Sequence, residues 1–270
     1  MITATRVALA LALGAALAQP AASAAGTPAV ADLVSRMKAV LEPAQPSLRK
    51  LTIRTSSPWK GEYQQFVAGQ ARKRGAAGAR VVTVLLAPAD QRGTGWLVQE
   101  SPQETLQWLW VPYVSRVRKL YPLPGYEAFL ESDFTYADLG LVDMHAKYTL
   151  LGEETLGDKT VYRVQAVPAE QWYYSRIVSW MDAASGFPLK REFYASGGDL
   201  WKVETFDQVT EIQGVPTVLR RRMDNIQEKT TTEITVSSVR YGADIPDSLF
   251  EVGQLPTTSS APIWSSVGLD

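Results

Sequence analysis

Two neighbouring segments dominate this sequence: Trp108-Leu-Trp-Val-Pro-Tyr-Val-Ser-Arg-Val-Arg-Lys-Leu120, and then Ser132-Asp-Phe-Thr-Tyr-Ala-Asp-Leu139. Successive side chains of a β-strand point to opposite faces of the sheet, so we expect Leu106, Trp108 and Trp110 to share one face. This apolar face has two interpretations. It is either part of a filled sheet core, which is the commoner role of paired tryptophans, or one wall of an apolar cavity.

The residues that follow combine positive charge with aromatic side chains. Pro112 ends the tryptophan-rich strand, and Arg116 and Arg118 then lie in a second extended segment. Phe134 and Tyr136 have the size and partial polarity to cover an apolar mouth. If the tryptophan face lines a cavity, we expect the two arginines at its rim, where they can meet an anionic head group.

The order of these segments resembles that of a known family. A Trp-Leu-Trp-Val-Pro strand, a basic run and then Ser-Asp-Phe-Thr-Tyr-Ala-Asp-Leu are similar to the LolA-like outer membrane lipoprotein-sorting proteins of Gram-negative bacteria, over about residues 29–252. The resemblance implies a mainly β fold, in which a single strongly curved antiparallel sheet forms an open half-barrel around an apolar cavity. It also implies an N-terminal helix that helps to close the cavity.

The periodicity of the remaining sequence agrees with this fold. Apolar residues recur at helical spacing over residues 29–41, with Val34, Met37 and Leu41 expected against the sheet. From residue 48 to residue 241, alternating segments separated by turn residues predict a meander of about ten or more antiparallel strands. Residues 122–131 interrupt this pattern and are a candidate lid. Asp133, just beyond them, is a candidate ion-pair partner of Arg116 or Arg118.

The N-terminal residues predict export. Residues 1–24 contain Arg6, an apolar run and then Ala22-Ser23-Ala24, the three regions of a cleavable secretory signal peptide. The chain has no cysteine, so it lacks the residue that is acylated in lipoproteins. We therefore expect a soluble, monomeric periplasmic protein, with one half-barrel domain over residues 25–254 and a flexible tail over residues 255–270.

Composition and motifs exclude several classes of function. The formal net charge is −1, so nothing in the overall charge favours nucleic acid. His145 is the only histidine, and the absence of cysteine removes thiolate chemistry and the common zinc sites. The Gly-x-Ser-x-Gly elbow and the phosphate-binding glycine motifs are also missing. We expect no enzyme activity, no cofactor and no metal site.

Two functions remain. The first is a periplasmic carrier or acceptor that binds a lipid or a lipoprotein acyl chain, in lipoprotein sorting or lipid transport to the outer membrane; the resemblance implies an inner-membrane exporter as a further partner. The second is a periplasmic sensor that binds a protein such as an anti-sigma factor or an exporter. For the carrier, the expected ligand-binding residues are Trp96, Val98, Leu106, Trp108, Trp110, Arg116, Arg118, Phe134 and Tyr136.

Overall fold

The computed structural model describes residues 28–75, 78–101, 104–120, 128–139, 144–169 and 172–268. The expected signal peptide of residues 1–24 lies outside these ranges, as does most of the expected lid.

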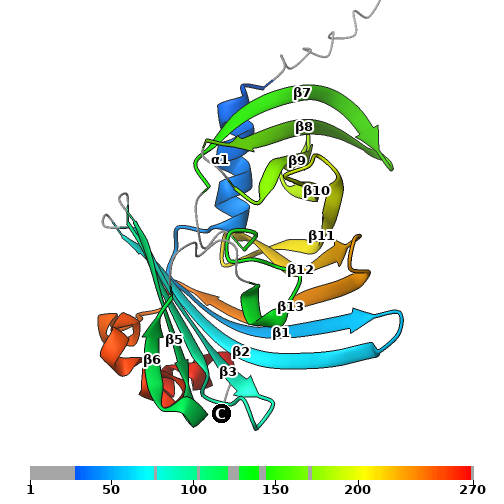
Figure 1. Cartoon of the computed structure of the whole chain (residues 1–270). Coiled ribbons are helices and arrows are strands. Elements are labelled where there is room, and N and C mark those ends of the chain that lie inside the picture. Colours follow the sequence, from blue (N-terminus) through cyan, green and yellow to red (C-terminus); the bar gives the residue numbers. More distant parts are fainter. Residues whose placement is uncertain are drawn as a thin grey trace, which may run out of the picture.

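The described residues form one antiparallel sheet of thirteen strands with a single α-helix, α1 (Val30–Leu41), as Figure 1 shows. The prediction of a mainly β, strongly curved and open sheet is therefore confirmed. The strands are β1 (Ser47–Ser57), β2 (Gly61–Gly75), β3 (Gly78–Ala87), β4 (Gly95–Glu100), β5 (Thr105–Val111), β6 (Arg116–Lys119), β7 (Ala146–Leu156), β8 (Lys159–Pro168), β9 (Tyr174–Asp182), β10 (Pro188–Ala195), β11 (Leu200–Ile212), β12 (Val215–Asn225) and β13 (Thr230–Tyr241).

The sheet consists of two meanders that are joined at its centre. The strand order is β6-β5-β4-β3-β2-β1-β13-β12-β11-β10-β9-β8-β7, so strands that are neighbours in sequence pair within each half, and β1 pairs with β13 where the halves meet. The predicted meander is confirmed within both halves. Between β6 and β7, however, the chain crosses from one edge of the sheet to the other. Residues 128–139 belong to this crossing and lie between the halves.

The sheet has two faces with different covers. We call inner the face on which the two halves pack toward each other, and outer the opposite face. Inner residues of the first half, such as Ile53 and Phe66, share one core with Ile177 and Phe193 of the second half. On the outer face of the first half, Leu48, Val82 and Leu97 pack against residues from the C-terminal segment.

Helix α1 packs on the second half of the sheet. Leu33, Met37 and Val40 are its buried residues, at the three- and four-residue spacing of one helix face. Leu33 and Met37 contact Val164 of β8 and Met181 of β9. The predicted contact of Met37 is thus confirmed, whereas the expected Val34 and Leu41 lie half-buried at the sides of this stripe.

The C-terminal residues are packed, so the prediction of a flexible tail is wrong for residues 255–268. They continue a series of 3-10 turns, η3 (Asp247–Phe250), η4 (Val252–Ser260) and η5 (Pro262–Val267), which lies against the outer face and appears in orange and red in Figure 1. Leu255 and Trp264 are 1% and 2% exposed. Trp264 Nε1 also donates a 2.7 Å hydrogen bond to the carbonyl of Thr258.

Gly95 of β4 shows why this packing is specific. A Cβ atom at this position would lie 3.0 Å from Cδ1 of Leu255, closer than ordinary van der Waals contact. The absence of a side chain on Gly95 therefore makes the space in which Leu255 sits. The composition of the C-terminal segment did not predict that it packs on the sheet, because a few apolar residues at the right positions are enough to cover a sheet face.

We expect Trp264→Ala to lower the free energy of unfolding by about 3–5 kcal/mol, the usual cost of deleting a buried tryptophan. Ser260→Ala, at an exposed position of the same segment, is the matched control and should change it by less than about 0.5 kcal/mol. Urea unfolding of both variants measures the difference. If Trp264→Ala behaved like the control, the tail would be loose in solution.

Candidate functional site

The inner face is filled by residues 128–139, which we call the plug. Phe129, Leu130, Phe134 and Tyr136 of the plug are each at most 3% exposed and belong to the core shared by both halves of the sheet. The rings of Phe129 and Tyr136 meet edge to face, with centroids 5.5 Å apart. Phe134 and Tyr136 were expected to cover a mouth. They instead occupy the interior.

The plug holds its shape through local hydrogen bonds. The backbone N–H of Thr135 donates to Oδ2 of Asp138 at 2.8 Å, and the N–H of Asp138 donates to Oγ1 of Thr135 at 3.2 Å. This reciprocal pair is that of a capping box, which a Thr-x-x-Asp sequence allows. Leu130 and Glu131 have positive φ angles of 53° and 55°, which are unfavourable for residues with side chains. The surroundings must compensate this local strain.

One polar cluster fixes the plug near Asp133. Its carboxylate accepts hydrogen bonds from the hydroxyls of Thr230 at 2.5 Å and Thr232 at 2.7 Å, both on β13. Asn225 Nδ2 donates to the same carboxylate at 3.4 Å, and Lys202 Nζ donates to the backbone carbonyl of Asp133 at 2.7 Å. The buried carboxylate is thus satisfied by strands β12 and β13, and β11 holds the backbone carbonyl of the same residue.

The expected ion pair of Asp133 with Arg116 or Arg118 is therefore wrong. Both arginines lie on the exposed edge strand β6, whereas Asp133 is 7% exposed and contacts the opposite half of the sheet. The prediction relied on the short distance in sequence between the arginines and Asp133, but the chain leaves β6 and crosses to the other half of the sheet before it reaches β7.

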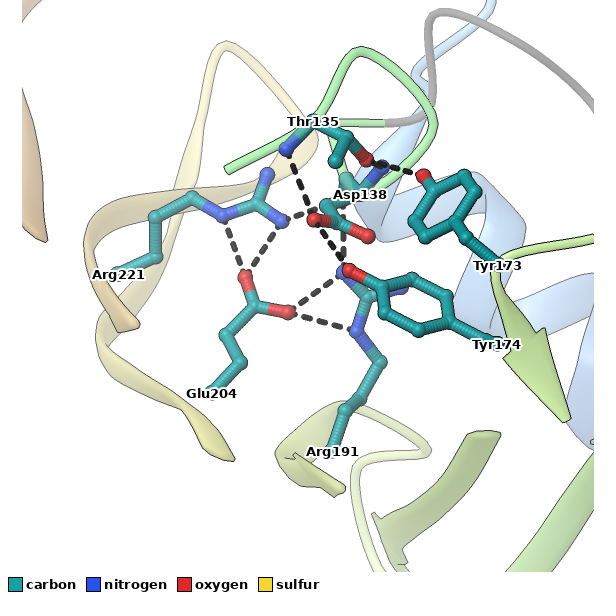
Figure 2. Close-up of polar contacts among 7 residues, drawn as sticks. All are labelled: Thr135, Asp138, Tyr173, Tyr174, Arg191, Glu204 and Arg221. Carbon is teal, nitrogen blue, oxygen red and sulfur yellow. Dashed lines mark hydrogen bonds and ion pairs between the residues drawn. The ribbon is translucent and has the colours of Figure 1, made fainter. Parts of the chain in front are cut away.

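A second polar cluster, shown in Figure 2, is centred on Glu204. Arg191 Nε donates to Oε2 of Glu204 at 2.7 Å, and Arg221 Nε donates to Oε1 at 2.6 Å. Each arginine also donates from Nη2 to the backbone carbonyl of Asp138, at 2.7 Å and 2.8 Å. Glu204 is 0% exposed, so two guanidinium groups and one carboxylate are held together away from water.

Two tyrosines complete this cluster. Tyr174 donates from its hydroxyl to Oδ2 of Asp138 at 3.0 Å, and the hydroxyls of Tyr173 and Thr135 lie 2.6 Å apart. Burial, and then the nearby carboxylate of Asp138, raise the pKa of Tyr174. Burial lowers the pKa of Arg221, while the charge of Glu204 acts in the opposite direction. Tyr174 therefore stays a neutral donor at physiological pH.

The tryptophans that attract attention in the sequence lie on opposite faces. Trp96 pairs with Leu109, whereas Trp108 pairs with Leu97 and Trp110 with Gly95. Residues directly opposite each other in an antiparallel pair share a face, so Trp108 and Trp110 cannot face the same side as Trp96. Trp96 is at the inner core, and Trp108 and Trp110 are packed against the C-terminal turns.

The prediction that these aromatic residues line one common cavity is thus wrong. Leu106 shares the face of Trp108 and Trp110, as the alternation predicts, but this is the outer face. Val98 is buried on the inner face with Trp96. Arg116 and Arg118 pair with Val111 and Leu109, so both point to the inner side at the exposed edge of the sheet. The structure brings together Trp96, Val98, Phe134 and Tyr136.

Among the described residues, two hollows lie beside the plug, each with a cavity volume of about 60 Å³. The first, which we call the arginine hollow, is lined by Arg49, Arg72 and Arg221 and by apolar residues of α1, the plug and the sheet. The second, the tyrosine hollow, is lined by Tyr148 and Tyr174 and by Ala137 and Asp138 of the plug. Typical ligand pockets measure about 300–1,000 Å³. Neither hollow holds an acyl chain in this arrangement.

Comparison with known proteins identifies the fold and the family. A family model described as that of an uncharacterized protein matches residues 78–257, which is more than half of the chain. The chain belongs to this family, and its fold is LolA-like. None of the curated proteins matches it.

Three solved structures share the LolA-like fold over most of their length. A putative outer membrane lipoprotein-sorting protein domain from Vibrio parahaemolyticus is 21% identical, with a TM-score of 0.74 and coverage of 84% of this chain and 96% of that one. A DUF1329 family protein from Desulfovibrio piger is 25% identical, with a TM-score of 0.75 and coverage of 83% and 96%. A LolA superfamily protein from Nitrosomonas europaea is 19% identical, with a TM-score of 0.69 and coverage of 83% and 98%.

Arg191, Glu204 and Arg221 of this LolA-like protein are not among the residues that the sequence pattern predicts for the site. A signal for them exists. Arg191 alternates in phase with buried Phe193, and Glu204 alternates in phase with buried Phe206. Charged residues in the apolar phase of a strand are rarely buried without partners, so this phase points to a buried polar cluster. Which charges meet is settled only by the register of β10 to β12.

We expect Glu204→Gln to lower the free energy of unfolding by about 3–5 kcal/mol, because it leaves two buried guanidinium groups without a compensating charge. Glu233→Gln is the matched control, since the side chain of Glu233 is 31% exposed and should contribute only about 0–1 kcal/mol. Chemical unfolding of both variants checks the difference. A Glu204→Gln effect as small as that of the control would show that Arg191 and Arg221 find other partners.

Proposed function

We propose that this LolA-like protein is a periplasmic carrier or acceptor for a lipid or a lipoprotein acyl chain, and that it works by binding and release without covalent chemistry. The observation that carries the proposal is the plug, an apolar segment that fills the inner face but is fastened to the sheet by polar groups. The fold it shares with lipoprotein-sorting relatives supports the same function. Among the described residues, no helix is long and apolar enough to span a membrane.

The energetics of the exchange are favourable for a carrier. An acyl chain gains about 0.8 kcal/mol per buried methylene, so ten methylenes supply about 8 kcal/mol before ordering costs. Against this gain stands the loss of the plug's own burial. The positive φ angles of Leu130 and Glu131 lower the stability of the plugged state, which reduces the cost of displacing it. Plug and acyl chain are therefore competitors for one apolar surface.

The inner residues define the proposed contacts. Trp96 and Val98 of β4 lie in the inner core and are the proposed acyl-chain contacts, whereas Phe134 and Tyr136 of the plug occupy the same core and are the side chains that the acyl chain displaces. Leu106, Trp108 and Trp110 lie on the outer face, where Trp108 and Trp110 pack against the C-terminal turns, and are left out of the proposal. Arg116 and Arg118, exposed on the edge strand, are proposed to guide an anionic cargo or its membrane partner at the entrance. An inner-membrane exporter is the proposed source of the cargo.

We expect Trp96→Ala to weaken the binding of a fluorescent acyl probe several-fold, since the side chain contributes to the inner face. Trp110→Ala is the matched control: it removes the same side chain from the outer face of the adjacent strand and should lower stability while leaving probe affinity unchanged. Fluorescence titration and urea unfolding of both variants separate the two effects. Mass spectrometry of lipid that co-purifies with the exported protein identifies the natural cargo. Equal loss of affinity in both variants would contradict an inner-face site.

Loosening the plug should have the opposite effect on binding. We expect Asp133→Ala to raise the apparent affinity for the acyl probe, because the plugged state competes with the ligand and loses its contacts to Thr230 and Thr232. The same substitution should lower the free energy of unfolding. Asp207→Ala, which removes an exposed carboxylate paired with Arg220, is the control and should change neither quantity appreciably. Weaker probe binding in Asp133→Ala would mean that the plug forms part of the site and does not compete for it.

A further inference from the structure

The arginine hollow is chemically unusual for the interior of a sheet. It lies between the end of α1, the plug and strands β1, β2, β12 and β13, and part of its wall is apolar, including Leu51, Phe129 and Val236. Arg49, Arg72 and Arg221 also line it. Three guanidinium groups at one small interior hollow require either nearby carboxylates or an anionic ligand.

The sheet register explains why these arginines meet. Arg49 follows the same alternation as Leu51 and Ile53 of β1, which lie in the inner core. Arg49 pairs with Gln70 of β2, and Arg72 is the next residue of β2 on the same face. Arg221 of β12 pairs with Ile234, another inner residue. The arginines therefore occupy inner positions that elsewhere in these strands hold apolar side chains.

The carboxylates around the hollow are already shared. Arg72 Nη2 lies 3.6 Å from Oε2 of Glu42, but the same oxygen lies 2.9 Å from Nη2 of Arg74. Glu204, the partner of Arg221, is shared with Arg191. Among the described side chains, Glu42 and Glu204 thus each serve two arginines and Glu100 lies 3.9 Å from Arg74, but none of these carboxylates pairs with Arg49, which leaves an excess of positive charge beside it.

Arg49 carries much of this excess. Within the described part of the chain it forms no ion pair, and its Nε is buried without a hydrogen-bond partner. Its Nη2 donates to the hydroxyl of Tyr241 at 3.2 Å, a neutral acceptor. Arg72 is 3% exposed, and burial lowers its pKa to about 10; the charge of Glu42 acts in the opposite direction, and the charge of Arg49 lowers the pKa further. An anion between these two arginines would relieve both effects.

We propose that the arginine hollow is the head-group site for the cargo, and that it binds a lipid bearing an oxyanion, a carboxylate or a phosphate, through Arg49 and Arg72. This inference rests on the proposed carrier function. Guanidinium groups bind such oxyanions through paired hydrogen bonds. The hollow's cavity volume of about 60 Å³ suits a head group alone. The acyl chain extends from it along the surface that Phe129 now covers, so the head-group site and the plug-covered surface are continuous.

The test compares ligands that differ only in the head group. We expect the wild-type protein to bind hexadecanoate at least tenfold more tightly than hexadecanol in a displacement titration with the acyl probe. Arg49→Gln should abolish most of this preference and leave the affinity for hexadecanol unchanged. Arg54→Gln is the matched control, because Arg54 lies on the same strand with an exposed side chain on the opposite face. It should preserve the preference.

Hexadecyl phosphate and inorganic phosphate distinguish the possible sources of the oxyanion. Tighter binding of hexadecyl phosphate than of hexadecanoate assigns the site to phosphate-bearing lipids, and the reverse order assigns it to fatty acids; both support the proposal. Inorganic phosphate that binds in an Arg49-dependent manner, without any lipid preference, would overturn it in favour of a free-anion site. Equal affinity of the wild-type protein for hexadecanoate and hexadecanol would overturn the head-group site while the carrier function stands. No binding of any lipid would instead contradict the carrier function itself.

Discussion

Glu204 lies fully buried between the guanidinium groups of Arg191 and Arg221, and both arginines also donate to the backbone carbonyl of Asp138. Buried charges of this kind are tolerated only when they are paired and hydrogen-bonded. Their pairing joins strands β10, β11 and β12 to the plug. The plug in turn supplies the aromatic side chains that fill the space between the two halves of the sheet. The packing of the interior therefore depends on this polar cluster, together with the hydrogen bonds of Asp133 to β12 and β13.

A broad curved sheet has two faces, and each must be covered. The outer face of the first half is covered by the C-terminal turns, whose contacts with the sheet are mainly apolar, as those of Leu255 and Trp264 show. The inner face is covered by α1 and the plug, and the plug is fastened by hydrogen bonds of Asp133 and Asp138. Polar contacts are directional, and they can be replaced by contacts to water or to a ligand at modest net cost. This difference is the reason to place the function on the inner face.

The helix, the strands and the turns could be predicted because they depend on local patterns. Helical spacing marks α1, and period-two alternation marks strands such as β1 and β13. Leu106, Trp108 and Trp110 do share a face, as alternation requires. The face itself could not be assigned, because a shift of one residue in the pairing of β4 with β5 exchanges inner for outer. The packing of the C-terminal segment could not be predicted for a similar reason. Its few apolar residues can pack on the sheet only because β4 has a glycine, Gly95, beneath Leu255.

The class of fold, the helix, the approximate strand boundaries and the resemblance to LolA-like proteins could be predicted from the sequence, because all of these follow from the order and spacing of residues along the chain. Three features required the tertiary structure: residues 128–139 fill the interior, Asp133 contacts β13, and Arg49, Arg72 and Arg221 line one hollow. These contacts join residues about a hundred positions or more apart in the chain. They arise because β1 pairs with β13, which places the first and last strands of the sequence side by side and sets the register of the inner contacts.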